Sequence, residues 1–332
     1  MPEPTKVRLS ELMDARRKRA PLRLTDFSTN KEQSASQKAI NKLLESNLTK
    51  AGFELDKFGT LLKQSDAEAR QSMAQLIAEA DKQSPAVLDT LHRTVGDWRN
   101  RVGRLTTLAL PDAPARPVLL DTATEIVVGS PNSSAFFTQI STGTGPGSAS
   151  NFAQFQFDKS FGEPGIIDFG TIGEVEVSFG FLWQNPSDNN AVVNVDGYIL
   201  LNGFCWVFSD GGFLPGNRFS RLYVDAILVI HELWNEPPTS PIEQPYQSRN
   251  ALDISCDSWG FLASVGHDEG NLFRGFDLGY SQFVLPPKGT AMFEVICSIG
   301  YHSRDGDVHA LFTGNGRQVM CPGVLISDIL FG

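Results

Sequence analysis

The side chains best suited to hold a metal ion are histidines and carboxylates in the C-terminal half of the sequence. Four histidines lie close to acidic residues there, as His231-Glu232, His267-Asp268-Glu269, and His302 and His309 on either side of Asp305-Gly306-Asp307. On neighbouring strands, imidazoles and a carboxylate would give an open-sided metal centre, and a metal-dependent jelly-roll enzyme is therefore one alternative function. The His-x-His pair with a following Glu that such a centre uses is missing. The pattern favours solvated turn residues and predicts no metal and no cofactor.

Nucleophilic chemistry is not indicated either. The sequence has no Gly-x-Ser-x-Gly elbow, and the glycine-rich stretch at 142–147 is followed by no lysine that would bind a phosphate. Four cysteines lie at wide spacings in apolar surroundings, at Cys205, Cys256, Cys297 and Cys321. We expect them to be buried free thiols rather than nucleophiles or disulfides. The sequence thus predicts a protein that is not an enzyme.

Residues 234–247 form a proline-rich segment that is too long for a hairpin turn. Long loops on a rigid sandwich often carry binding contacts. The aromatic residues at its ends, Trp234 and Tyr246, would offer stacking surfaces to a glycan or a protein partner, or would pack under the loop. The segment is therefore a candidate binding site.

Residues 133–157 are rich in Ser, Thr, Gln and Gly, and phenylalanines flank the turn at Gly145-Pro146-Gly147. The membrane-inserting hairpins of pore-forming toxins have this weakly hydrophobic, two-faced character. An ordinary surface hairpin has the same character, and we favour it. A pore-forming toxin is accordingly the first alternative function.

The N-terminal third of the chain has the periodicity of amphipathic helices. Apolar residues at steps of three or four predict one helix over about 40–62, a second from Ser65, and a third that opens at Ser84-Pro85. The apolar stripe of the third helix consists of Leu88, Leu91, Val95, Trp98, Val102 and Leu105. Its regular spacing predicts a buried seam, either in an intramolecular three-helix bundle or in a coiled coil between chains.

The periodicity changes from helical to two-residue alternation after a cluster of prolines. We therefore divide the chain into a basic segment (1–33), a helical arm (34–108), a proline-rich linker (109–117) and a β domain (118–332). Many strand-like runs without intervening helices predict an antiparallel two-sheet sandwich, most simply a jelly roll, with a closed barrel as the alternative. The fold class is thus α+β in segregated parts.

Charge divides the chain in the same way. Residues 1–116 hold 20 Lys and Arg against 15 Asp and Glu, and residues 117–332 hold 8 against 23. An acidic β domain is unsuited to gripping nucleic acid, so any such contact would come from Arg16-Arg17-Lys18-Arg19. No signal peptide or transmembrane segment is recognised, which predicts cytoplasmic synthesis and leaves the final location open.

These observations favour a non-enzymatic binding or assembly protein. In this hypothesis the helical arm docks or self-associates, and the sandwich is displayed to a protein partner or a glycan. Coat and tail-associated components of particles have this form, because jelly rolls pack side by side and carry loops well.

Overall fold

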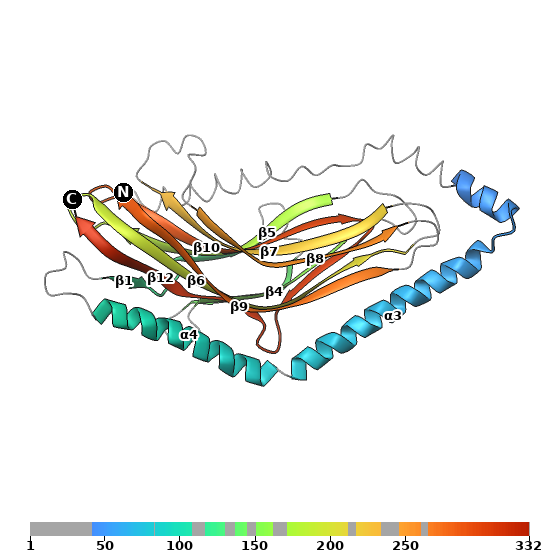
Figure 1. The fold of residues 1–332 in the computed structure, drawn as a ribbon, viewed down its shortest axis with the longest axis horizontal. Coiled ribbons are helices and arrows are strands. Elements are labelled where there is room, and N and C mark those ends of the chain that lie inside the picture. The colour runs from blue at the N-terminus through green and yellow to red at the C-terminus, as the bar shows by residue number, and fades with distance from the viewer. Residues whose placement is uncertain are drawn as a thin grey trace.

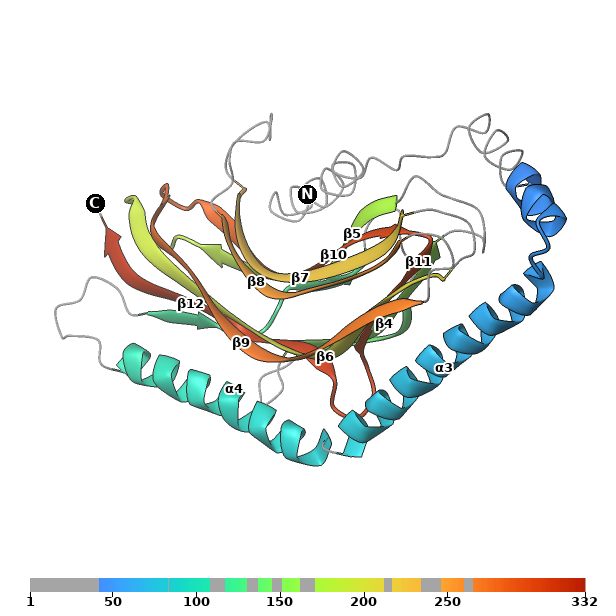
Figure 2. The same cartoon turned by 45° about the vertical axis from the view of Figure 1, so that its right-hand side comes forward.

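The computed structural model describes residues 42–82, 84–107, 117–129, 137–144, 151–161, 171–211, 217–233, 246–259 and 265–331. In these residues two antiparallel sheets are stacked face to face, and two long helices lie along the outer side of one sheet (Figures 1 and 2). The helices, the first sheet and the second sheet therefore form three successive layers.

The two sheets are named here by their position relative to the helices. Sheet A, next to the helices, contains β1 (Val118–Leu120), β3 (Phe137–Thr144), β4 (Asn151–Phe161), β6 (Ala191–Ser209), β9 (Gly266–Leu285), β11 (Gly306–Phe312) and β12 (Gln318–Phe331). Sheet B contains β2 (Glu125–Val128), β5 (Thr171–Gln184), β7 (Asn217–Glu232), β8 (Tyr246–Trp259) and β10 (Thr290–Arg304).

The strand order confirms the antiparallel sandwich. Sheet A has the order β1-β12-β4-β11-β6-β9, with β3 beside β4, and sheet B has the order β2-β5-β10-β7-β8. β11 and β12 pair with β6 one after the other along its length, so they share one position in the sheet. From β4 to β11 successive strands change sheet, except that β7 and β8 are neighbours in sheet B, and this order is that of a jelly roll. The closed barrel is wrong, because the strands divide into two separate sheets.

The inner strand β6, which lies between β9 and the pair β11 and β12, is buried on both faces over most of its length. Alternate residues such as Ile199, Leu201 and Val207 belong to the core between the sheets. The residues between them point to the outer side, where Tyr198, Leu200, Phe204, Trp206 and Phe208 pack under the helices. A strand covered on both faces becomes a continuous apolar run instead of an alternating one. Sheet A therefore needs a second covering layer, which the helices supply.

Within the described residues α3 and α4 do not pack as a bundle, and the predicted bundle or coiled coil is not confirmed. α3 (Leu55–Lys82) and α4 (Ser84–Thr107) follow one another as an open V along sheet A (Figure 2). The α4 stripe is buried, but against the sheet: Leu91, Val95, Trp98 and Val102 pack with Tyr198, Leu200, Met320 and Leu325. The side chains of Leu88 and Leu105 lie outside the described residues. Periodicity identifies an apolar helix face without identifying its partner.

The predicted boundaries of the first two helices are also wrong. A helical segment at 42–50 ends in a turn at Gly52, whose φ of +88° suits a residue without a Cβ. α3 then starts at Leu55 and continues past Ser65 to Lys82. The third predicted start, at Ser84, is confirmed.

A loop of sheet A fixes the junction between α3 and α4. Residues 313–317 leave the sheet between β11 and β12 and approach the helix junction (Figure 1). Asn202 Nδ2 donates to the Gly316 carbonyl at 2.8 Å, which anchors the loop on β6. Arg317 Nη1 lies 2.5 Å from Asp81 Oδ1 near the end of α3. The interruption of the strand thus provides the ion pair that holds the end of α3.

Replacing Trp98 with alanine tests the α4 contact. The indole is 4 % exposed and stacks on Tyr198 with ring centroids 5.6 Å apart. Its loss should lower the free energy of unfolding by about 3 to 5 kcal/mol in denaturant titrations. The control is His92→Ala on the exposed side of the same helix, which should change stability by less than about 0.5 kcal/mol. Equal effects of the two substitutions would contradict burial of this stripe.

Candidate functional site

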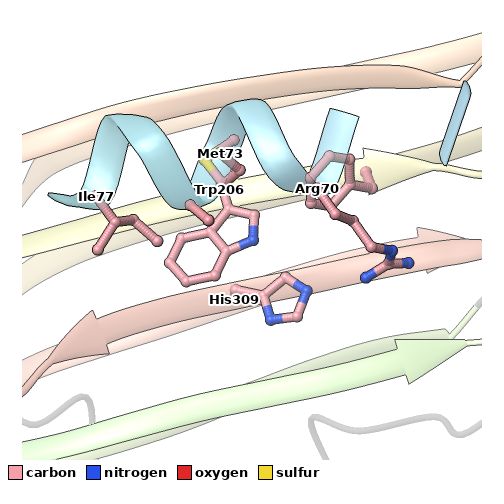
Figure 3. A pocket seen from close by; sticks show the side chains of 7 residues that line it. Arg70, Met73, Ile77, Trp206 and His309 are labelled. Atoms are coloured by element: carbon pink, nitrogen blue, oxygen red, sulfur yellow. The ribbon is translucent and has the colours of Figure 1, made fainter. Parts of the chain in front are cut away.

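A small pocket lies where α3 crosses β6 and β11 (Figure 3). It has a volume of about 220 Å³ and is lined by Arg70, Met73, Ala74, Ile77, Trp206, Phe208 and His309. The helix supplies an apolar edge through Met73 and Ile77, and the sheet supplies aromatic rings. Arg70 and His309 are the polar groups among the lining residues.

Ionic hydrogen bonds join α3 to the sheet beside this pocket. Arg70 Nη2 donates to Asp307 Oδ2 at 2.6 Å, and Arg70 Nε donates to the Asp66 carboxylate at 3.1 Å. His309 Nδ1 lies 2.7 Å from Asp158 Oδ1, and its Nε2 lies 4.0 Å from Asp307 Oδ2. Arg70, Asp307, His309 and Asp158 are named the Asp307 cluster below. It links the helix to β11 and β4 through one almost fully buried carboxylate.

Aromatic packing holds the His309 ring in place. The imidazole stacks on Trp206 with centroids 4.7 Å apart and an interplanar angle of 11°, and Phe208 meets it edge-on. Arg70 also lies over Phe208, 5.3 Å from the ring centroid. Cations above aromatic faces gain electrostatic attraction in addition to their carboxylate contacts. The cluster is therefore fixed by both charge and packing.

Two titratable groups here have raised pKa values. Burial lowers the pKa of His309, but its hydrogen bond to Asp158 and the negative charges of Asp158 and Asp307 outweigh burial and raise the pKa overall. Burial, together with the negative charge of Asp307, raises the pKa of the nearby Asp210 to about 6. Both groups therefore hold protons at higher pH than they would in an unfolded chain.

The arrangement suits attachment better than catalysis. A His–Asp pair can form part of a catalytic triad, but a base must reach the proton it abstracts. Nε2 of His309 is buried and has no hydrogen-bond partner within the described part of the chain. Arg70 is already bonded to two carboxylates. The cluster is a polar joint between α3 and the sheet.

The four histidines proposed as metal ligands do not converge. His231 donates to or accepts from Glu294 at 2.8 Å on sheet B, and His302 packs edge-on against Phe219 on the same sheet. His309 lies on sheet A, and His267 is exposed on β9. Within the described ranges, no group of three His, Cys, Asp or Glu side chains is placed to hold a metal ion. The role of Asp307 and His309 in attaching α3 was not predicted from the sequence.

The cysteines are free thiols, as expected. Cys205, Cys297 and Cys321 are buried and Cys256 is partly buried. Burial raises the pKa of the Cys256 thiol to about 11, and it raises the pKa values of the other three as well. These thiols therefore stay protonated near neutral pH, which opposes nucleophilic chemistry.

The two segments proposed for binding or insertion differ in what the structure describes. Trp234 lies outside the described residues, and Tyr246 starts β8 opposite Val229, with its side chain outside them. The predicted hairpin at 133–157 corresponds to β3 and β4, while its turn at 145–147 lies outside. β4 also pairs with β11 and β12, so it is an inner strand rather than part of a surface hairpin. That expectation is corrected.

No helix in the described part of the chain is long and apolar enough to cross a membrane. Insertion of the 133–157 segment would have to break the pairing of β4 with β11 and β12. It would also extract Phe155 and Phe157, which are completely buried between the sheets. The geometry thus opposes the toxin alternative.

The Asp307 cluster predicts a stability that falls as the pH rises. Unfolded histidine titrates near pH 6.5, about its ordinary value. The folded pKa of His309 is higher, so its stabilising effect is complete below that pH and is lost as the pH rises through the folded value. Asp210 acts in the same direction between its ordinary value and about 6. His309→Gln should lower the free energy of unfolding by about 1 to 3 kcal/mol at pH 6 and flatten the dependence above it.

Denaturant titrations between pH 5 and 9 check this prediction. The matched control is His267→Gln, since that side chain is exposed on β9. It should leave the slope of stability against pH unchanged. A wild-type slope that survives in His309→Gln would assign the pH dependence to another group.

A dye-release experiment checks the position of β4. Because its strand pairing and buried phenylalanines hold it in sheet A, the protein should release no dye from liposomes near neutral pH. Leakage that an engineered disulfide between β4 and β11 abolishes, and that reduction restores, would contradict this and favour the toxin alternative.

Comparison with known proteins identifies no family. No protein-family model and no curated protein matches the chain. Among solved structures, TmCBM61 in complex with β-1,4-galactotriose shares 11 % identity over 57 % of this chain and 90 % of its own, with a TM-score of 0.17. The mannan-recognising module TmCBM27 is 15 % identical to this chain, over 60 % of this chain and 100 % of the module, with a TM-score of 0.16. A chain in the structure of infectious bursal disease virus Gt strain is 13 % identical, over 58 % of this chain and 38 % of the viral chain, with a TM-score of 0.15. Similarities this weak carry no argument about function.

Proposed function

We propose that the protein is a non-enzymatic binding or assembly protein, in which the helices brace one sheet and the sandwich is displayed to a partner. The observation that carries this proposal is the attachment of α3 and α4 to the outer side of sheet A. Two apolar clusters, the Asp307 cluster and the Arg317–Asp81 pair together fix the helices there. The helices therefore stiffen the sandwich, as we expect in a structural module.

The chemistry of the described side chains supports the same proposal. The histidine and arginine at the pocket are bonded to carboxylates of the same chain, and the cysteines are protonated thiols. The pocket volume of about 220 Å³ is below the range of 300–1,000 Å³ usual for small-molecule sites. A display function needs neither a reactive group nor a deep cavity.

Self-association through the arm requires surfaces other than the α4 stripe, since that stripe is buried against sheet A. The arm carries exposed apolar side chains at Leu43, Phe53, Leu61 and Leu76. Leu61 is 59 % exposed and Leu76 is 41 % exposed, both on α3. We propose that these residues contact another copy of the chain in an assembly, as in a particle component.

Native mass spectrometry of the purified chain tests this proposal. Species larger than the 36.3 kDa monomer should form over a concentration range of about 1 to 50 µM, and Leu61→Ser with Leu76→Ser should shift them toward monomer. The control is Leu330→Ser, which removes a side chain of similar exposure from β12. A wild-type monomer at every concentration, or equal losses in both variants, would contradict assembly through the arm.

A further inference from the structure

The outer face of sheet B lies on the side of the sandwich away from α3 and α4 (Figure 2). It combines carboxylates with an apolar row. Glu174 on β5, Asp225 on β7 and Asp253 on β8 supply the charge. Ile227 and Val229 on β7 are partly exposed and lie beside Ile296 and Glu294 of β10. This combination is suited to a basic segment that also has apolar side chains.

Close packing brings the charged groups of this face together. A Cβ at Gly300 would lie within 2.2 Å of three ring and hydroxyl atoms of Tyr223, so the glycine allows the tyrosine to lie across β10. Gly300 pairs with Tyr223 on one side and with Glu174 on the other, and burial, followed by the charges of Glu174 and Asp225, raises the pKa of the tyrosine. Glu174 accepts a hydrogen bond from the Ser298 hydroxyl, which holds that carboxylate over the sheet.

Among the described side chains, the negative charge of this face is only partly neutralised by its own groups. Arg221 Nε donates to Asp253 Oδ1 at 2.8 Å and Arg221 Nη2 donates to Asp253 Oδ2 at 2.5 Å. Asp225 accepts a neutral hydrogen bond from Asn250 Nδ2 at 2.9 Å. Burial and the charges of Glu174 and Asp253 raise the pKa of Asp225 against that bond. A cation placed beside Glu174 and Asp225 would therefore relieve electrostatic repulsion.

The chain itself contains a segment of the opposite charge, outside the described residues. Residues 6–23 include seven cations and two acids, at Lys6, Arg8, Arg16, Arg17, Lys18, Arg19 and Arg23, with Glu11 and Asp14. They also include Leu9, Leu12 and Met13. The residues between Arg23 and the helical segment at 42–50 span up to about 60 Å when extended, which exceeds the roughly 50 Å length of a strand such as β10.

We propose that the outer face of sheet B is the docking site of residues 6–23 of the same chain. The cations lie beside Glu174 and Asp225, and the apolar side chains cover the row along β7 and β10. In this arrangement residues 6–23 cover sheet B and are held mainly by charge, whereas α3 and α4 cover sheet A through apolar packing. It does not depend on which partner the sandwich binds.

Limited trypsin digestion of the full chain tests this proposal. Trypsin cleaves after lysine and arginine, so the sites at Arg16 to Arg19 report whether the segment is docked. Glu174→Gln with Asp225→Asn should accelerate cleavage there about fivefold at low salt, because proteolysis follows the population of the undocked form. The control Glu79→Gln with Asp97→Asn removes the same charge from exposed helix positions and should leave the rate unchanged.

Two further measurements on the wild-type chain separate the outcomes. Raising NaCl from about 50 to 500 mM should accelerate cleavage at Arg16 to Arg19 more than in a free peptide of residues 6–23, because salt screens the contact. Protection should be independent of protein concentration. Protection that disappears on dilution would assign the site to a second copy and overturn docking within one chain. Equal cleavage in the wild type and the Glu174 and Asp225 variant, together with no excess salt effect over the peptide, would overturn it altogether.

Discussion

Sheet A has apolar side chains on both of its faces, and the covering of its outer face is the constraint on which the architecture depends. An exposed row containing Tyr198, Leu200 and Phe204 would leave several large side chains in water, each worth about 1.5 to 3 kcal/mol when buried. The sandwich core cannot bury them, because it already holds the alternate residues of the same strand. The helices are therefore part of the folded domain rather than an appended arm. Because sheet A has apolar side chains on its outer face as well, the apolar stripes of the helices pack on the sheet and not on each other.

Apolar contact alone would not determine where each helix lies, because hydrophobic burial has no direction. For α3, two ion pairs provide the missing specificity. Arg70, in the middle of α3, contacts Asp307 on β11. Asp81, near the end of α3, contacts Arg317. Sliding the helix by one turn would separate both pairs and remove the Arg70 guanidinium from the nearly buried Asp307 carboxylate. Apolar contacts thus hold α3 on sheet A, and the ion pairs determine its position along the sheet.

The sequence predicted the features that depend on local patterns. Alternation and turn residues identified the strands of the sandwich, and Ser84-Pro85 marked the start of α4. The partner of the α4 stripe was not predictable from its spacing. The apolar stretch of β6 at 198–208, interrupted at Asn202 and Gly203, was nevertheless a signal that a second layer covers this strand. The Asp307 cluster was missed because its members come from α3, β4 and β11, and only tertiary packing brings them together. His309 was therefore assigned to a solvated turn, because Asp305 and Gly306 precede it in the sequence.

The apolar contacts of α4 also determine the order in which the chain can complete its fold. Trp98 and its neighbours pack on Met320 and Leu325 of β12, which follows all the other described strands in the sequence. During synthesis the helices leave the ribosome long before that strand exists, so their apolar face must wait for the rest of the sandwich. Contacts between such distant parts of a chain are slow to form, because a long loop must close first. The helices are consequently made before the strands that cover their apolar faces, and those faces stay exposed to solvent until β12 has been made.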